Sequence, residues 1–290
     1  MADTLIHSVA EPAPVEERRR PPRARRTPTT YALRFVATAY LFLLVAWPVS
    51  LVAVNTFDDG FASIRSLVED PDMVVALQLS AYVAVWSVVI NTLFGVGISL
   101  LLVRYQFPGK RLLNALLDIP LSVSPIVVGL ALVLVYGGRN GWFGPTLLGW
   151  GFQVIFSTPG IIMATTFVAL PLMIREIVPV LEEVGIEQEQ AAESLGASAL
   201  QRFWRITLPS IKWGIVYGVV LTLARSLGEF GAVKVVSGNV LGQTRTATLA
   251  VEEKYLNFDP QGAYATAFLL AMVSVACIVV VAIIRPKNHS

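Results

Sequence analysis

Four side chains close to the end of an apolar stretch, residues 211–236, have types that could interact with an anion. Arg225 and Glu229 lie four residues apart, so on a helix they share a face and can form an ion pair. Lys234 and Ser237 follow, where the stretch meets its outer boundary. Ionisable side chains in an apolar span are costly and usually face a bundle interior or a water-filled path. Arg225 or Lys234 could therefore offer positive charge to an anion, unless Arg225 and Glu229 only neutralise each other and Lys234 extends to the membrane surface.

A polar stretch earlier in the chain has residues suited to contact with another protein. Residues 187–195 contain no β-branched residue and predict a short helix. Gly196 follows directly, at the place where the end of a helix favours a residue that can take a positive φ. Ser198 and Gln201 form a capping-box pattern, which predicts the start of a second helix. Pro209 marks the next expected boundary.

The first of these helices carries a small apolar patch of Ala191, Ala192 and Leu195. Small side chains there would let the surface of another protein approach the helix backbone closely. The spacing resembles the cytoplasmic EAA loop in permease subunits of bacterial ABC importers, on these positions: Ala191, Ala192, Gly196, Ile206, Leu208 and Pro209. Where that family usually has glutamate this chain has Gln190, with Glu189 beside it. The resemblance implies a coupling helix that docks on an ATPase subunit, whereas the alternative is an ordinary amphipathic pair of surface helices.

These loops belong to a chain whose composition differs from that of a soluble domain. Of its 290 residues, 55% are hydrophobic and 14% are charged, against about 45–50% and 25% in soluble domains. The one cysteine, Cys277, excludes a disulfide framework, and the two histidines lie in the terminal segments. We therefore expect no metal site and no serine–histidine nucleophile. The only Gly-Lys pair, Gly109-Lys110, lacks the upstream glycine of a phosphate-binding loop, so ATP must be used by a partner or an ion gradient must drive the chain.

Six apolar windows are each long enough to cross a bilayer, which needs about 20 residues. They cover about residues 35–55, 74–103, 112–136, 159–180, 211–236 and 262–284. Pro120 and Pro125 break the third window, and we expect its cytoplasmic part to be kinked or irregular. The sequence thus predicts an all-α membrane protein with six transmembrane helices.

The distribution of basic residues predicts the orientation of these spans. Sixteen of the 22 lysines and arginines fall in segments 18–34, 104–111, 175–212 and 285–287. If these segments are cytoplasmic, both termini lie inside and the segments 139–156 and 238–260 lie outside.

The first 30 residues are rich in proline, arginine and glutamate and predict a disordered cytoplasmic tail. The tail lacks the apolar core of a signal peptide. Its arginine cluster, residues 18–26, could be taken for a nucleic-acid patch. Directly before a membrane span, it is better interpreted as an anchor on anionic lipid, with no nucleic-acid partner.

Residues near the fifth window carry a second resemblance. The run from Gly228 to Asn239, then Gln243-Thr244 and the segment 255–259 with sequence YLNFD, is similar to CysW-type permease subunits of bacterial sulfate/thiosulfate ABC importers. The resemblance implies a type I importer permease domain over residues 31–285, with the coupling loop at 185–209 and a short cytoplasmic tail at 286–290. It places the protein in the cytoplasmic membrane.

The resemblance also implies partners: an ATPase dimer that binds ATP and magnesium, a second and different permease, and an extracytoplasmic sulfate-binding protein. The chain itself would hold no cofactor and would be no enzyme. Three alternatives remain open. They are a molybdate or tungstate ABC permease, normally a homodimer, an ion-gradient-driven secondary transporter, and a membrane scaffold without a substrate.

Overall fold

The computed structural model describes residues 28–284, and this part of the chain consists of helices and loops without a β-strand. The expected tail of residues 1–30 lies outside the described part, except for its last three residues, which begin the first helix. The arginine cluster and the predicted tail at residues 286–290 also lie outside it.

The chain divides into two units, residues 1–48 and 49–290. The first unit contains α1 (Pro28–Leu41), the π-helix η1 (Phe42–Ala46) and the beginning of α2 (Trp47–Thr56). These elements form one continuous apolar helical stretch that is long enough to cross a membrane. It corresponds to the first predicted span, and it starts earlier than the apolar window does.

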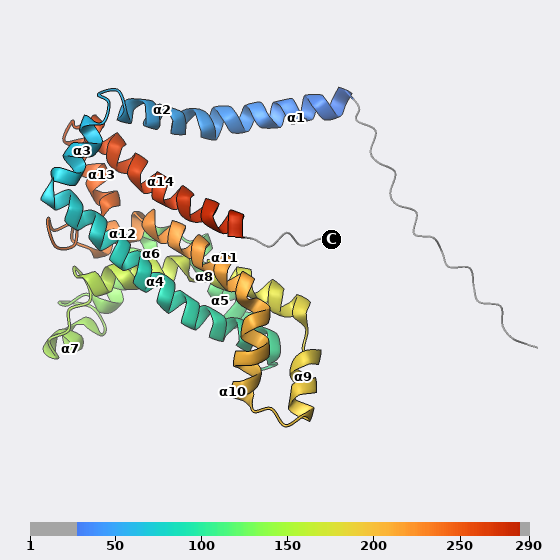
Figure 1. Ribbon diagram of the computed structural model, residues 1–290. Coiled ribbons are helices and arrows are strands. Elements are labelled where there is room, and N and C mark those ends of the chain that lie inside the picture. The colour runs from blue at the N-terminus through green and yellow to red at the C-terminus, as the bar shows by residue number, and fades with distance from the viewer. Residues whose placement is uncertain (1–27, 285–290) are drawn as a thin grey trace, which may run out of the picture. The chain divides into compact units, whose positions relative to one another are not determined.

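Three long helices form the centre of the second unit: α4 (Pro71–Arg104), α8 (Thr158–Val184) and α11 (Leu208–Leu227). Figure 1 shows them side by side, with α14 (Pro260–Ile284) packed along α11. The start of α4 is fixed by Asp70, whose carboxylate accepts a 3.0 Å hydrogen bond from the backbone N–H of Asp72. This is an N-cap bond, and it satisfies one of the donors that the first turn of a helix leaves free.

Met173 of α8 is fully buried at the place where the three central helices meet. A Cβ atom at Gly95 of α4 would lie 2.5 Å from Met173 Cγ, and one at Gly218 of α11 would lie 2.4 Å from its Sδ. Both neighbours of Met173 must therefore be glycine for the helix backbones to approach this closely.

The described residues contain five helical stretches that are long and apolar enough to cross a membrane, and a sixth if a bent pair is counted as one span. The bent pair is α5 (Lys110–Ser122) and α6 (Pro125–Tyr136), whose axes turn by 114° at the break. Pro125 begins the second helix of the pair, so the predicted break in the third window is confirmed. Pro120, by contrast, lies inside α5, which stays helical through it.

The fifth predicted span differs from the structure at both ends. It starts earlier, because α10 (Ala199–Arg202), the π-helix η2 (Phe203–Thr207) and α11 form one helical stretch. The π turn ends at Thr207, two residues before Pro209, and π turns and prolines are both places where a helix can bend. The span also ends earlier, at Leu227, and residues 231–236 form the separate helix α12 (Gly231–Val236).

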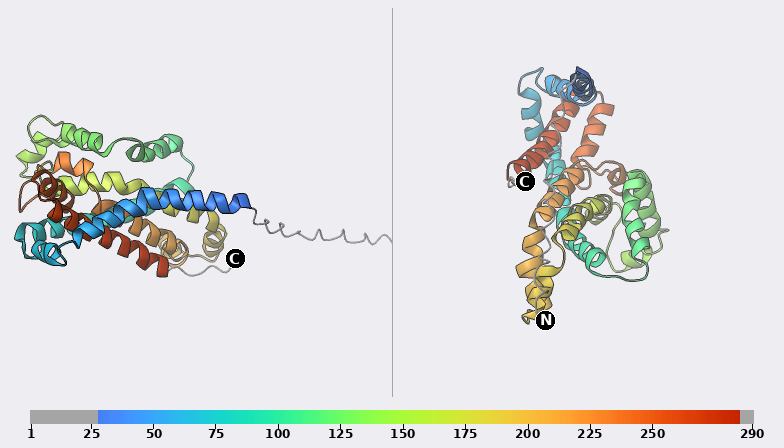
Figure 2. Two further views of the ribbon diagram at one scale, coloured as in Figure 1. Left: turned by 90° about the horizontal axis from the view of Figure 1, so that it is seen from above. Right: turned by 90° about the vertical axis from the view of Figure 1, so that its right-hand side faces the viewer.

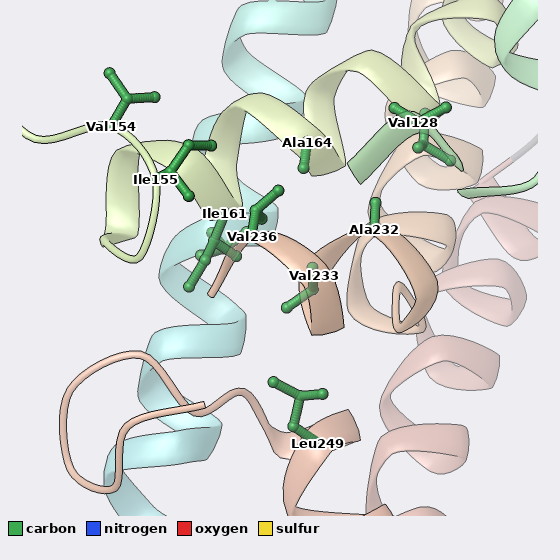
Figure 3. Close-up of a cluster of buried hydrophobic side chains, with 11 residues drawn as sticks. Val128, Val154, Ile155, Ile161, Ala164, Ala232, Val233, Val236 and Leu249 are labelled. Carbon is green, nitrogen blue, oxygen red and sulfur yellow. The ribbon is translucent and has the colours of Figure 1, made fainter. Parts of the chain in front are cut away.

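Short elements lie at the two ends of the central helices (Figures 1 and 2). One end holds α3 (Ala62–Glu69), α7 (Gly144–Gly149), α12 and α13 (Ala247–Leu256). The opposite end holds α9 (Glu187–Ser194), α10 and η2. Figure 3 shows how α12 is fixed in an apolar cluster: Ala232, Val233 and Val236 face side chains of α6, α8 and α13. All three are almost fully buried, so their packing holds α12 in place. This helix in turn positions Lys234, which it carries, and Ser237, which follows it directly.

Candidate functional site

The turn between α9 and α10 has the geometry that its sequence predicts. Gly196 has a φ of +85°, its N–H donates to Glu193 O at 2.9 Å, and Ala197 N–H donates to Ala192 O at 3.0 Å. This pair of bonds is a Schellman motif, which satisfies carbonyl groups at the end of α9. Ser198 then starts α10 with a complete capping box, in which its side chain and that of Gln201 exchange bonds with the backbone.

The tip of this helical hairpin presents apolar side chains to its surroundings. Leu195 is 89% exposed and Leu200 is 68% exposed, on either side of Gly196. Ala191 is exposed and Ala192 is half-buried. Leu200 was missed by sequence reasoning, although its place two residues after the N-cap of α10 could have indicated it. Two exposed leucines around a tight turn, with small residues beside them, can insert into an apolar groove of another protein.

Glu189 has a different place from the rest of the predicted coupling residues. Its carboxylate accepts a 3.1 Å hydrogen bond from Arg104 Nη2 and a 2.9 Å hydrogen bond from Thr207 Oγ1. Arg104 also donates to the backbone oxygens of Leu181 and Gly185 at the end of α8. Glu189 therefore faces its own chain, whereas its neighbour Gln190 is exposed. Sequence reasoning missed Arg104, because it stands 85 positions away from Glu189.

The remaining predicted residues of the loop motif lie where η2 passes into α11. Ile206 and Leu208 are half-buried and Pro209 is exposed. They shape the base of the hairpin and are not at its tip. Thr207, between them, is buried and holds Glu189.

At the opposite end of the central helices, Arg225 and Glu229 form the predicted ion pair, with 2.7 Å between Nη1 and Oε2. The side chain of Glu229 is 2% exposed and that of Arg225 is 36% exposed. Glu229 Oε1 also accepts a 3.0 Å hydrogen bond from Ala232 N–H, in the first turn of α12. The carboxylate thus fixes both the end of α11 and the start of α12, and it leaves part of the guanidinium accessible.

Lys234 and Ser237 are engaged with other groups. The Lys234 ammonium forms an ion pair with Glu252 of α13 and lies 5.3 Å from the centre of the Phe230 ring. Ser237 is fully buried, and its hydroxyl oxygen accepts a 3.1 Å hydrogen bond from Asn239 N–H. Sequence reasoning missed Glu252, since nothing in the spacing pairs α13 with α12. Of the four predicted pathway residues, Arg225 and Glu229 are therefore brought together, while Lys234 and Ser237 have partners of their own.

A metal centre has no support in the described part of the chain, where no group of three or more His, Cys, Asp or Glu residues is placed to hold an ion. The two regions described above can bind a protein partner and interact with charge.

Comparison with known proteins decides the family. Residues 92–288 match the family described as "Binding-protein-dependent transport system inner membrane component". The chain belongs to this family. It is therefore a multi-pass membrane protein of the ABC importer permease type, as its helices and motifs predicted.

Several relatives have closely similar sequences. The chain is 45% identical to the "Sulfate transport system permease protein CysW" of Synechocystis sp., over 89% of this chain and 93% of the relative. It is 40% identical to the protein of the same description from Escherichia coli, over 83% and 81%. It is 34% identical to the "Sulfate transport system permease protein CysT" of Salmonella typhimurium, over 82% and 87%. The similarity to CysW-type permeases that the motifs indicated is thus confirmed.

Solved structures support the fold alone. A bacterial ABC transporter involved in the import of alginate has a TM-score of 0.70 at 15% identity, covering 88% of this chain and 93% of that one. A bacterial alginate ABC transporter in complex with a pentasaccharide-bound periplasmic protein has a TM-score of 0.72 at 16% identity, covering 87% and 92%.

Proposed function

We propose that this chain is a CysW-type permease subunit of an ATP-driven importer that moves sulfate or thiosulfate inward across the bacterial cytoplasmic membrane. In this proposal an ATPase dimer supplies the energy and binds ATP and magnesium. A second, homologous permease completes the membrane path, and an extracytoplasmic binding protein delivers the anion. The named substrate of the relatives at 40–45% identity supports the choice of sulfate.

The observation that carries the proposal is the α9–α10 hairpin. It projects an apolar tip, Leu195 and Leu200, from an otherwise polar segment. An exposed leucine pair of this kind favours contact with a protein, because apolar side chains gain free energy when they are removed from water. The ATPase is the partner that the family and the loop motif indicate.

The orientation we propose places this hairpin in the cytoplasm. The same end of the second unit holds the turn from α4 to α5, with Arg104, Lys110 and Arg111, and basic residues favour the cytoplasmic side. The opposite end, with α7, α12 and α13, then faces the binding protein.

The path of the anion is proposed to pass Arg225. A dianion that leaves water needs compensating charge or many hydrogen bonds. Arg225 keeps about a third of its side chain exposed and uses one nitrogen in its ion pair with Glu229. A guanidinium has five N–H donors, so others remain for an oxyanion. The Glu229 carboxylate holds this guanidinium in place.

Purification from native membranes tests the proposal. A tagged chain should bring down an ATPase and a second, different permease in constant proportion. A complex with two copies of this chain would favour the molybdate type of importer. A chain that purifies without any ATPase from membranes where it is functional would overturn the proposal.

A further inference from the structure

The coupling helix α9 is joined to the rest of the chain through two glycines. Gly185, before the helix, has a φ of +70°, and Gly196, after it, has a φ of +85°. Both values lie in the left-handed region, which glycine enters with little cost. The eight residues of α9 therefore form a short rigid element between two backbone positions that accept large changes of direction.

Side-chain bonds of Glu189 tie this short helix to the central helices. Its carboxylate meets Arg104 at the end of α4 and Thr207 at the end of η2, directly before α11. Arg104 in turn donates to Leu181 O at 3.2 Å and to Gly185 O at 2.7 Å. One guanidinium and one carboxylate thus join α4, α8, α9 and η2.

The burial of this pair gives its interaction more weight than that of an exposed ion pair. Arg104 is 11% exposed and Glu189 is 21% exposed, so solvent screens their charges only partly. The planar fork of the arginine suits several acceptors at fixed angles. Because two backbone carbonyls hold the same fork, loss of the carboxylate would release α9 while Arg104 stays at the end of α8.

The helix that carries Arg104 also reaches the opposite end of the molecule. Near the start of α4, Ser80 Oγ accepts a 2.8 Å hydrogen bond from Ala247 N–H of α13. Asp70, the residue before α4, has its Oδ2 atom 3.8 Å from Nζ of Lys254, which also belongs to α13. A displacement applied to the last residue of this 34-residue helix can therefore act on α13, at the far end.

We propose that Arg104 is a positioning residue that passes the movement of α9, through Glu189, to α4. The inference rests on the proposed function, because the ATPase is taken to move α9. It separates two roles within the hairpin. Leu195 and Leu200 make the contact with the ATPase, whereas Arg104 and Glu189 transmit its movement and have no part in the contact.

The test compares variants in the complete complex, reconstituted in vesicles with ATPase, second permease and binding protein. Glu189→Gln and Arg104→Gln each remove one charge of the pair. With either variant, the ATPase should co-purify in the wild-type proportion. The number of ATP molecules hydrolysed per sulfate imported should rise above the wild-type value, because ATP would be hydrolysed without the movement reaching α4. Arg104→Lys keeps the charge without the fork and should give an intermediate rise.

Asp118→Asn is the matched control. Asp118 forms a 2.8 Å ion pair with Arg175 in which both side chains are at least half exposed, and this pair joins α5 to α8 and not to α9. The Asp118→Asn variant should leave the number of ATP molecules hydrolysed per sulfate imported unchanged. Thr207→Val removes the second bond to Glu189 at nearly constant volume and keeps the test available if Arg104→Gln fails to fold.

Two results would overturn the inference. One is an unchanged ratio of ATP to sulfate in Glu189→Gln and Thr207→Val. The other is loss of ATPase from the Glu189→Gln complex, which would make the carboxylate part of the contact itself. Failure of the wild-type chain to retain an ATPase would instead contradict the proposed function.

Discussion

Replacing Gly196 with valine strains the turn between α9 and α10, although the space around the new Cβ atom is open. The φ of Gly196 is +85°, and a Cβ atom there would meet nothing within 4 Å. The main cost of a Cβ atom at this position is therefore the strained backbone conformation, because the space around the Cβ is open. A left-handed conformation costs an ordinary L-residue about 1–2 kcal/mol, and a β-branched residue more than that.

This cost can be converted into a population of the correct turn. A free-energy change of about 1–2 kcal/mol alters a two-state ratio by about 5- to 30-fold. Gly196→Ala should lower the ratio of correctly formed to incorrectly formed hairpins by roughly this factor, and Gly196→Val should lower it further. Gly196→Asn should have a smaller effect, because asparagine enters the left-handed region more readily than other residues do.

The assay is the amount of ATPase retained by a fixed amount of purified permease. Retention should fall in the order Gly, Asn, Ala, Val at position 196. Gly60→Val is the matched control, since Gly60 has a φ of +70° and open space around its Cβ position but lies in the loop before α3. Wild-type retention with valine at position 196, or an equal loss in the Gly60→Val control, would refute the reasoning.

Further predictions concern the hairpin face, the anion path and the topology. Ala191→Trp should lower ATPase retention at normal membrane yield, because Ala191 is exposed and a large ring there would prevent close approach; unchanged retention would remove this face from the contact. Glu229→Gln should lower the melting temperature of the complex, since the change weakens an ion pair whose buried carboxylate also caps α12; the cost should stay below the about 3–5 kcal/mol of a fully buried pair, because Arg225 is partly exposed, and equal melting curves would contradict this. Lys234→Ala should weaken uptake only mildly, because the ammonium is paired with Glu252; a complete loss would show that Lys234 carries the anion. A cysteine at Asn140, with Cys277→Ser, should react with an impermeant thiol reagent from outside; protection there would reverse the orientation.

The helical hairpin could be predicted from the sequence because its determinants are local. The end of α9 depends on Gly196, and the start of α10 depends on Ser198 and Gln201, all within a few residues. Caps and turns of this kind are encoded by residue types at short, fixed spacing. The pairing of Arg225 with Glu229 has the same origin, since four residues separate them on one helix.

The contacts that hold the hairpin and the outer cluster could not be predicted in this way. Glu189 meets Arg104 across 85 positions, and Lys234 meets Glu252 across 18. Such contacts depend on how separate helices pack, which the periodicity of one segment does not specify. The sequence placed Glu189 in the ATPase-coupling loop and left Lys234 open between an anion path and the membrane surface; in the fold each has a charged partner within the chain.

The ends of the fifth span show a similar limit. Hydropathy continues from residue 211 to residue 236, so one helix is expected over the whole window. The Glu229 carboxylate binds Ala232 N–H and starts a new helix there, an effect that an average of apolar character does not reveal. At the other end, α10 and η2 continue directly into α11, and Pro209 lies in the first turn of α11.

Uptake of radiolabelled sulfate into proteoliposomes tests the central claim most directly. The vesicles would contain this chain, its second permease and its ATPase. ATP would be present on the side of the ATPase, inside the vesicles, and the binding protein would be added on the opposite side. We predict uptake that requires ATP and the binding protein and that persists when ionophores abolish every ion gradient. Uptake that proceeds without ATP and is driven by an ion gradient would contradict the account and would make the chain a secondary transporter.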